Sequence, residues 1–397
     1  MSPTELLAPA GDEECIAAAL RFGADAVYIG GDLLQLRATK AAFDRRRLAD
    51  AVSYVHGQGK RIYITVNSFA KNRELQPLAE YARFLYDAGA DAAIVSDIGA
   101  VSVIKKNAPD LAVHISTQAN CCNWAAANVY YNMGAERVVL AREMTLEEIA
   151  ELRAHTPKAL DLEAFVHGAM CMSYSGRCLI SSFMNGRSGN RGECTQPCRW
   201  SYYLVEQKRP EEYFEIEEHD GASAILSSHD LNCIAFIDRL RDAGVTSFKI
   251  EGRMKTAYYV ASVVNAYRRR LDGCEDIDLL QRELESVSHR PFASGFYFGE
   301  VTGNHFNDGL YHSDCLFVGV VQDAVPGGYR IQQRNQFKTG DTLEIVAPDR
   351  LGDSFVVREI VSSTGETVDS AKLVGEIVTV KTDAALQRGD FLRLRKS

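Results

Sequence analysis

The sequence lacks any segment suited to crossing a membrane or to directing secretion. No stretch offers the ~18 uninterrupted apolar residues of a spanning helix. The opening residues MSPTELLAPAGDEEC have no basic region followed by an apolar one. We therefore expect a cytoplasmic protein with no membrane partner, in a compartment that keeps thiols reduced. The ten cysteines are then candidates for ligands or redox groups rather than for disulfides.

The chain also lacks a net positive charge. Its formal net charge is -9, so no overall basic field attracts nucleic acid, and any RNA contact must come from a local patch. With 397 residues and 46% hydrophobic content, the chain is long enough for one domain of about 250 residues and a smaller one.

Two hydrolase motifs are missing as well. The sequence contains neither the H-E-x-x-H motif of zinc peptidases nor the G-x-S-x-G turn that presents a nucleophilic serine. A cysteine peptidase would need one activated thiol paired with a histidine, whereas the thiols here are clustered. These absences argue against a peptidase.

What the chain does have is a cluster of four cysteines, Cys171, Cys178, Cys194 and Cys198. Clustered thiols in a reducing compartment bind a metal, carry redox chemistry or are buried as small apolar groups. The spacing C-x6-C-x15-C-x3-C lacks the two tight pairs of a structural zinc site and favours an iron-sulfur cluster, which spreads its thiolates further apart. A radical-type C-x3-C-x2-C motif would need a cysteine at Ser201.

A repeated pattern organises the first 255 residues. A glycine precedes a short apolar run at Gly23, Gly89, Gly134 and Gly244. Each repeat is typical of a helix end, where glycine adopts the left-handed conformation, followed by a strand buried on both faces. We expect strands near residues 5–8, 26–30, 61–67, 92–96, 111–117, 137–142, 160–167 and 247–251. Eight such units predict a TIM-type (β/α)8 barrel, with a doubly wound open sheet as the alternative.

We expect three parts along the chain. Residues 1–275 form the barrel, with a cysteine-rich insertion at 168–246 after the seventh strand. Residues 276–310 form a helix and a linker, and the alternating strands of 311–397 predict a small antiparallel β-barrel. Because the insertion follows the C-terminal end of a strand, it should lie on the face where such barrels carry their active sites.

Polar residues follow most of the expected strands at that same face. They are Asn67, Ser96, Asp97, Ser116, Thr117, Gln118, Arg142, Glu143, His167, Glu251 and Arg253. Together they predict a polar pocket, although each alone is more typical of a helix cap or a loop residue.

The run EAFVHGAMC at residues 163–171, continued by MSYSGRC, resembles the signature of the collagenase-like peptidase family U32. GNRGECTQPCRW, SSHDLN, SFKIEGRMKTAYYVA and SHRPFASGFYFG resemble further blocks of that family, so the likeness covers nearly the whole chain. The two-domain length and the C-x3-C-R-W ending are most similar to the branch of the family that hydroxylates tRNA.

The resemblance implies a TIM-type barrel with an oxygen-sensitive 4Fe-4S cluster and prephenate-dependent hydroxylation of the wobble uridine of tRNA to 5-hydroxyuridine. Its partners would be tRNA and prephenate, and the electron donor stays open. The resemblance gives Cys171, Cys178 and Cys194 as ligands. For the fourth ligand we favour Cys198, which closes the set locally, with Cys233 as the reserve.

Other residues receive roles from their chemistry. His167 and Glu251 are the catalytic candidates, and the histidine suits proton transfer near neutral pH. Prephenate is a dicarboxylate, so Arg253 and Lys255 are candidates for a cationic seat, unless they pair with Glu251.

RNA contacts are expected beside the cysteines and at two strand ends. Arginines interleaved with aromatic rings offer charge and a flat stacking surface, as at Tyr174, Arg187, Arg191, Arg199 and Trp200. Gln118 and Asn67 are candidates for reading a base edge. The alternatives are a family hydroxylase acting on ribosomal RNA or on a quinone precursor, a collagenase-like peptidase, and a non-catalytic RNA-binding or cluster-carrier protein.

Overall fold

The structure is a computed structural model. It describes residues 4–36, 43–200, 205–206, 209–213, 229–299, 311–348 and 350–396. Two compact units emerge: the first comprises Met1–Leu20, Ala24–Thr256 and His289–Tyr311, and the second Arg21–Gly23, Ala257–Ser288 and His312–Ser397. The sequence-based bounds at residues 275 and 310 stay a prediction beside this grouping.

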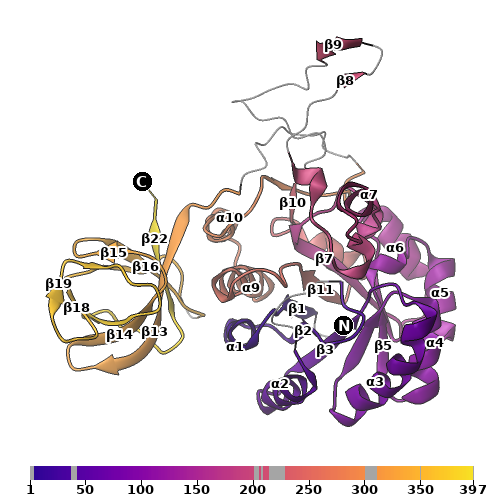
Figure 1. Ribbon diagram of the computed structural model, residues 1–397, viewed down its shortest axis with the longest axis horizontal. Helices are drawn as coiled ribbons and strands as arrows, with labels where there is room; N and C mark the ends of the chain where they lie inside the picture. Colours follow the sequence, from indigo (N-terminus) through magenta and orange to yellow (C-terminus); the bar gives the residue numbers. More distant parts are fainter. Residues whose placement is uncertain are drawn as a thin grey trace. The chain divides into compact units, whose positions relative to one another are not determined.

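The first unit contains a closed barrel of eight parallel strands (Figure 1). The strands are β1 (Glu5–Pro9), β2 (Ala26–Gly30), β3 (Arg61–Val66), β4 (Ala92–Val95), β5 (Ala112–Ile115), β6 (Arg137–Val139), β7 (Asp161–Ala169) and β11 (Ser247–Ile250). Strand β11 pairs in parallel with both β7 and β1, which closes the ring. The predicted TIM-type barrel is confirmed, and each expected strand lies within a few residues of its observed place.

Helices connect the strands on the outside of the barrel (Figure 1). They are α1 (Glu13–Arg21), α2 (Arg45–Gly57), α3 (Leu75–Asp87), α4 (Ile98–Asn107), α5 (Trp124–Asn132), α6 (Leu146–Ala154) and α8 (Ile237–Asp242). Side chains cap several of them: Asp44 and Asp97 accept from backbone amides, and Thr145 forms a capping box with Glu148. The four repeated glycines have φ between 81° and 103°, as the sequence pattern predicts.

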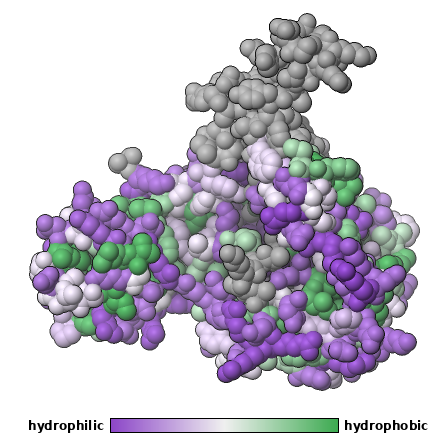
Figure 2. Space-filling view, in the orientation of Figure 1, coloured by the Kyte–Doolittle hydropathy of each residue, from purple (hydrophilic) through white to green (hydrophobic). Residues whose placement is uncertain are grey.

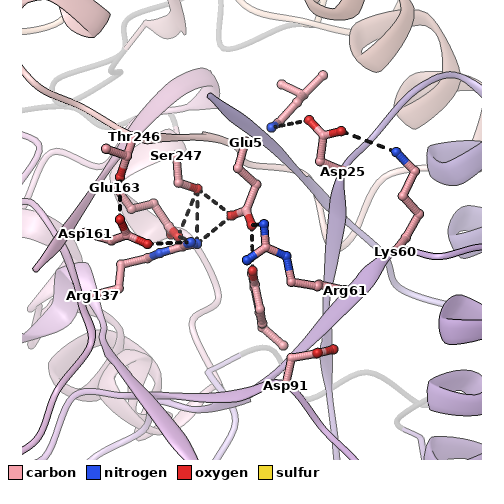
Figure 3. A network of polar contacts seen from close by, with 12 residues as sticks. Glu5, Asp25, Lys60, Arg61, Asp91, Arg137, Asp161, Glu163, Thr246 and Ser247 are labelled. Carbon is pink, nitrogen blue, oxygen red and sulfur yellow. Dashed lines mark hydrogen bonds and ion pairs between the residues drawn. The ribbon is translucent and has the colours of Figure 1, made fainter. Parts of the chain in front are cut away.

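The interior of the barrel is layered because alternate residues of each strand point inward. An apolar cluster consists of Leu7, Ala26, Tyr28, Tyr63, Ala92 and Ile94. Toward the N-terminal ends of the strands lies a network of buried charges around Arg137 (Figure 3). Its guanidinium contacts Glu5 at 2.5 Å and Glu163 at 3.1 Å, and Ser247 donates to Glu5. This layer has its charges paired.

Strand β7 continues beyond the barrel and begins the insertion. Its last residues, His167–Ala169, pair antiparallel with β10 (Asp230–Asn232), which pairs in turn with β12 (Phe292–Ala293). Arg290 locks this extension through a buried ion pair of 2.8 Å with Asp230. The sequence patterns did not predict these short strands.

The cysteine-rich insertion follows as a series of short turns of helix. They are η3 (Tyr174–Gly176), α7 (Ile180–Asn185), η4 (Gly189–Arg191) and η5 (Pro197–Arg199), followed by the strand pair β8 (Val205–Glu206) and β9 (Arg209–Tyr213).

The second unit combines two helices, α9 (Ala257–Leu271) and α10 (Ile277–Glu285), with an antiparallel sheet. The sheet is a half-barrel of eight strands: β13 (Cys315–Val325), β14 (Gly328–Gln333), β16 (Thr342–Val346), β17 (Ser354–Val356), β18 (Glu359–Val361), β19 (Thr367–Val368), β21 (Ile377–Lys381) and β22 (Phe391–Arg395). A small pair, β15 (Phe337–Lys338) and β20 (Ser370–Ala371), lies beside it. The predicted small antiparallel β domain is confirmed, built around one apolar core.

Candidate active site at the barrel mouth

A pocket of about 370 Å³ opens at the C-terminal ends of the barrel strands. Its floor comes from inward-facing residues of the strands, including Tyr28, Ile94, Phe165 and Lys249. Its upper wall comes from the cysteine-rich insertion. The pocket therefore joins the predicted polar strand ends to the predicted ligand cysteines in one space.

All four clustered cysteines line this pocket. All ten cysteines lie in the described ranges, and none forms a disulfide. Three of the four sulfurs contact the residue two positions later in the chain. The Cys171 sulfur lies 3.0 Å from the Ser173 hydroxyl. The sulfurs of Cys178 and Cys194 accept from the backbone amides of Ile180 and Gln196, each at 3.4 Å.

The first cysteine loop is held to the barrel by polar side chains at the ends of β5 and β6. The Glu143 carboxylate accepts from both the amide and the hydroxyl of Ser175. Ser175 is buried and has φ of 44°, a conformation that serine adopts only when neighbours impose it. The Gln118 side-chain amide donates to the Gly176 carbonyl at 3.2 Å, and the Gln118 backbone carbonyl accepts from Arg177 Nε at 2.7 Å. The barrel therefore dictates the shape of the loop between Cys171 and Cys178.

The second part of the insertion is clamped in a similar way. Asn190 forms a reciprocal pair of hydrogen bonds with the backbone of Cys178, at 3.1 and 3.0 Å. Arg191 forms an ion pair of 2.6 Å with Glu74 and also donates to the Phe69 carbonyl. Arg191, expected from the sequence to contact RNA, is thus engaged in holding the loop.

Four cysteine sulfurs face one pocket, and they are soft donors of the kind that an iron-sulfur cluster would take. In the described ranges, no group of three or more His, Cys, Asp or Glu side chains is placed to hold a metal ion. Cys198 shares the pocket with the other three. Cys233 is fully buried outside the lining, and burial raises its pKa well above the usual value. The choice of Cys198 over Cys233 stays a prediction, and this geometry favours it.

Cationic groups dominate the charged lining. Arg142, Arg187, Lys249 and Arg253 face one carboxylate, Glu251, among the described lining residues. Arg253 is almost fully buried and donates to the Thr65 hydroxyl at 2.7 Å. Asn67 also lines the pocket, where its side-chain oxygen accepts from the Leu36 amide. The predicted residues Asn67, Gln118, Glu251 and Arg253 therefore do meet in the pocket.

His167 lies outside the pocket lining. Strand β7 has one extra residue relative to β11, so His167 pairs with Ile250 instead of with an inward-facing residue. Its ring packs against Phe292 at 5.4 Å and is buried. Burial, with smaller contributions from His289 and Lys255, lowers the pKa of His167 to about 3. The ring is thus neutral near pH 7, and its catalytic role stays a prediction.

Other predicted residues lie near the pocket without lining it. Lys255 stacks over the Tyr311 ring at 4.4 Å. Tyr174 and Trp200 are 51% and 41% exposed, and burial together with nearby Cys122 raises the pKa of Tyr174 to about 12. The side chain of Arg199 lies outside the described part of the structure. Their roles in RNA or prephenate binding stay predictions.

An exposed apolar surface adjoins the cysteines. Leu179, Phe183 and Met184, on and beside α7, are 58%, 84% and 51% exposed. Figure 2 shows apolar side chains gathered where α7 lies. The segment from Cys171 to Trp200 also carries four arginines and a single acid, Glu193, in a chain whose net charge is negative. It is the kind of local basic and apolar patch that the sequence requires for any RNA contact.

Sequence reasoning missed Lys249 as a pocket residue and assigned no role to Arg142. Lys249 stands in the apolar run SFKIEG, and the signal was its alternation with Ser247 and Glu251, which places all three inside the barrel. Its Nζ lies 2.6 Å from Glu163, and burial lowers its pKa although the contact with Glu163 opposes the shift.

Comparison with known proteins gives consistent matches over the chain. Residues 11–307 match the model of peptidase family U32, and residues 313–393 match that of the peptidase family U32 C-terminal domain. The tRNA hydroxylation protein P1 of Bacillus subtilis is 36% identical, covering 99% of this chain and 95% of its own.

Two further relatives have different names. The 23S rRNA 5-hydroxycytidine C2501 synthase of Escherichia coli is 39% identical over 68% of this chain and 39% of its own. A protein named collagenase, from Porphyromonas gingivalis, is 34% identical over 75% of this chain and 74% of its own.

No helix in the described ranges is both long enough and apolar enough to cross a bilayer. The family models together span nearly all of the chain, and the matches to full-length relatives agree with them. The chain therefore belongs to the peptidase U32 family.

Proposed function

We propose that this protein is an RNA hydroxylase that converts the wobble uridine of tRNA to 5-hydroxyuridine, using a 4Fe-4S cluster and prephenate. The observation that carries the proposal is the pocket in which four cysteines and several cations meet at the catalytic face of the barrel. The names of two relatives support RNA hydroxylation as the reaction class.

The share of each relative's length that this chain matches supports tRNA rather than ribosomal RNA as the substrate. The chain spans 95% of the tRNA hydroxylation protein but only 39% of the ribosomal RNA enzyme, whose remaining length has no counterpart here. The same relationship supports a soluble site of action in the cytoplasm, where tRNA and prephenate are available.

In this proposal, Cys171, Cys178, Cys194 and Cys198 hold the cluster. The cluster supplies the redox chemistry that side chains alone do not provide when a ring carbon is oxidised. The contacts of Ser173 Oγ and of the Ile180 and Gln196 amides with three of the sulfurs would hold these side chains in place around the cluster.

The remaining residues bind and orient the substrates. In our proposal, Glu251, a carboxylate that lines the pocket, is the acid-base group beside the bound base. Gln118 is more than nine-tenths buried, and its Oε1 has no hydrogen-bond partner among the described residues, so it is available to a base edge. Phe183 and the arginines of the insertion offer stacking and phosphate contacts outside the pocket.

The proposal is tested by nucleoside analysis of tRNA from a strain that lacks this gene and its paralogues. Wild-type protein should restore wobble 5-hydroxyuridine, and Cys178→Ser should not, because one ligand is lost. Cys274→Ser, outside the pocket, is the matched control and should restore it fully. Restoration by Cys178→Ser, or no restoration by wild type, would contradict the assignment.

A further inference from the structure

The pocket carries more positive charge than a single carboxylate seat at Arg253 explains. Arg142 and Lys249 also line it, at the ends of β6 and β11. Both are largely buried, with side-chain exposures of 12% and 5%. Buried cations are costly unless they are paired, so their contacts indicate what they are placed to bind.

Lys249 is held by Glu163 in the barrel interior and also lines the pocket. Its Nζ donates to Glu163 Oε1 at 2.6 Å and lies 4.5 Å from the centre of the Tyr28 ring. Glu163 also forms an ion pair with Arg137, so two cations share this carboxylate. An ammonium has three N–H groups, and the bond to Glu163 uses one of them. The Glu163 contact thus holds the lysine in place while the pocket side of its ammonium remains available.

One edge of the Arg142 guanidinium makes no hydrogen bond among the described residues. Nη1 donates to the Ala169 carbonyl at 2.9 Å, and the guanidinium carbon lies 3.8 Å from the centre of the Phe165 ring. Nε is buried without a hydrogen-bond partner among the described residues, and Nη2 is 3.7 Å from Glu251, beyond hydrogen-bond range. The Nε–Nη2 edge is the one that forms bidentate pairs with a carboxylate.

The two cations share one aromatic wall. The Phe165 ring lies 3.8 Å from the Arg142 guanidinium and 5.5 Å from Lys249 Nζ. Arg253 reaches the same pocket from another side, beside Thr65. Tyr28 and Phe165 also line the pocket and provide an apolar surface beside these cations.

We propose that Arg142 and Lys249 form a second carboxylate seat, so that the pocket holds a compact dicarboxylate at two points, with Arg253 as the other. The apolar body of the ligand lies against Tyr28 and Phe165. This inference deepens the proposed function by taking prephenate as the dicarboxylate, and it assigns the second seat to Lys249 in place of Lys255.

A different explanation of the cations is that they neutralise the negative charge of a thiolate-bound cluster. The two explanations separate in protein from which iron has been removed. A carboxylate seat binds its ligand without the cluster, whereas cations that serve only to balance cluster charge do not select for dicarboxylates.

The experiment is calorimetric titration of iron-free full-length protein with prephenate and with phenylpyruvate, which carries one carboxylate. Wild type should bind prephenate more tightly. Lys249→Met should weaken prephenate binding about tenfold or more, as expected for the loss of a charge-assisted hydrogen bond. It should affect phenylpyruvate much less, so that the preference for the dicarboxylate disappears. Lys255→Met is the matched control and should stay within about twofold of wild type.

Arg142→Gln is the second variant, because Lys249→Met also leaves Glu163 with one cation fewer. It should reduce the same preference, with circular dichroism confirming the fold. Unchanged prephenate affinity in both variants, or no binding by wild type with or without iron, would overturn the second seat. Normal dicarboxylate binding without any hydroxylation of tRNA would instead contradict the proposed function and leave the seat standing.

Discussion

The two ends of the barrel interior use the same kinds of side chain in opposite ways. Near the N-terminal ends of the strands, Arg137 is surrounded by Glu5, Glu163 and Ser247 at hydrogen-bond distance (Figure 3). Near the C-terminal ends, four cations and one carboxylate, Glu251, are the charged groups among the described residues that line the pocket. In the first arrangement each buried charge has a partner of opposite sign, whereas the second has an excess of positive charge, which a bound anion would balance in our proposal.

The comparison teaches which charges serve the fold and which serve the chemistry. Removing one member of a completed buried network leaves an uncompensated charge and destabilises the protein. Removing one member of an excess of like charges relieves repulsion and harms binding instead. Glu163 connects the two ends, because it pairs with both Arg137 and Lys249.

The largest loss of stability is expected from breaking the network of buried ion pairs around Arg137. Glu163→Ala should lower the free energy of unfolding by about 3–5 kcal/mol, because it leaves two buried cations short of a partner. Urea denaturation of iron-free protein measures this loss. Arg61→Gln is the control: Arg61 also contacts Glu5, at 3.2 Å, but it is 56% exposed, so its variant should lose no more than about 1 kcal/mol. Equal losses in the two variants would contradict the distinction between the ends.

The next effect concerns mild acid. The folded-state pKa of His167 is about 3, below its unfolded value of about 6.5, so the unfolded state takes up the proton first. The contribution of His167 to the free energy of unfolding is therefore fully present above pH 6.5, and it decreases as the pH falls toward 3. At pH 5.5 this histidine alone should lower the free energy of unfolding by about 1 kcal/mol relative to pH 7.

The variant His167→Gln tests whether this histidine causes the loss of stability in mild acid. The variant should lose less stability than wild type between pH 7 and pH 5.5, by about the amount assigned to the one histidine. Buried His114, whose pKa burial also holds well below its usual value, stays in both proteins and supplies the remaining slope. Denaturation curves at the two pH values measure the difference, and identical slopes would rule out a neutral His167 as the cause.

The barrel was predictable from sequence because each buried parallel strand is a short apolar run and each preceding glycine marks a helix end. The gathering of the cysteines followed from their place after the seventh strand. The exclusion of His167 from the pocket was not predictable, since it depends on one extra residue in β7 relative to β11. Lys249 was missed for a related reason: whether a lone charge in an apolar strand meets a partner depends on Glu163, 86 positions away in the chain.

The left-handed conformation of Ser175 was equally hidden, because no serine signals positive φ by itself. It is produced by Glu143, a residue on a different loop, and it shapes the segment between two proposed ligands. The contact between Glu143 and Ser175 lies at the C-terminal ends of the barrel strands. Its loss should affect the order of the loop between Cys171 and Cys178 and leave global stability largely unchanged.

The most local effect is expected from breaking the contact between Glu143 and Ser175. Glu143→Gln removes a charged acceptor from the Ser175 amide and should raise hydrogen exchange in residues 171–178 about tenfold, equivalent to the loss of one charge-assisted hydrogen bond. Exchange in the barrel strands should not change. Glu193→Gln, an exposed acid of the same insertion, is the matched control and should leave the exchange as in wild type. If both variants behave alike, charge in the insertion matters rather than the contact with Ser175. If Glu143→Gln alone loosens the loop and lowers iron retention after reconstitution, the carboxylate positions the proposed ligands, and the open end depends on specific contacts as much as the paired end does.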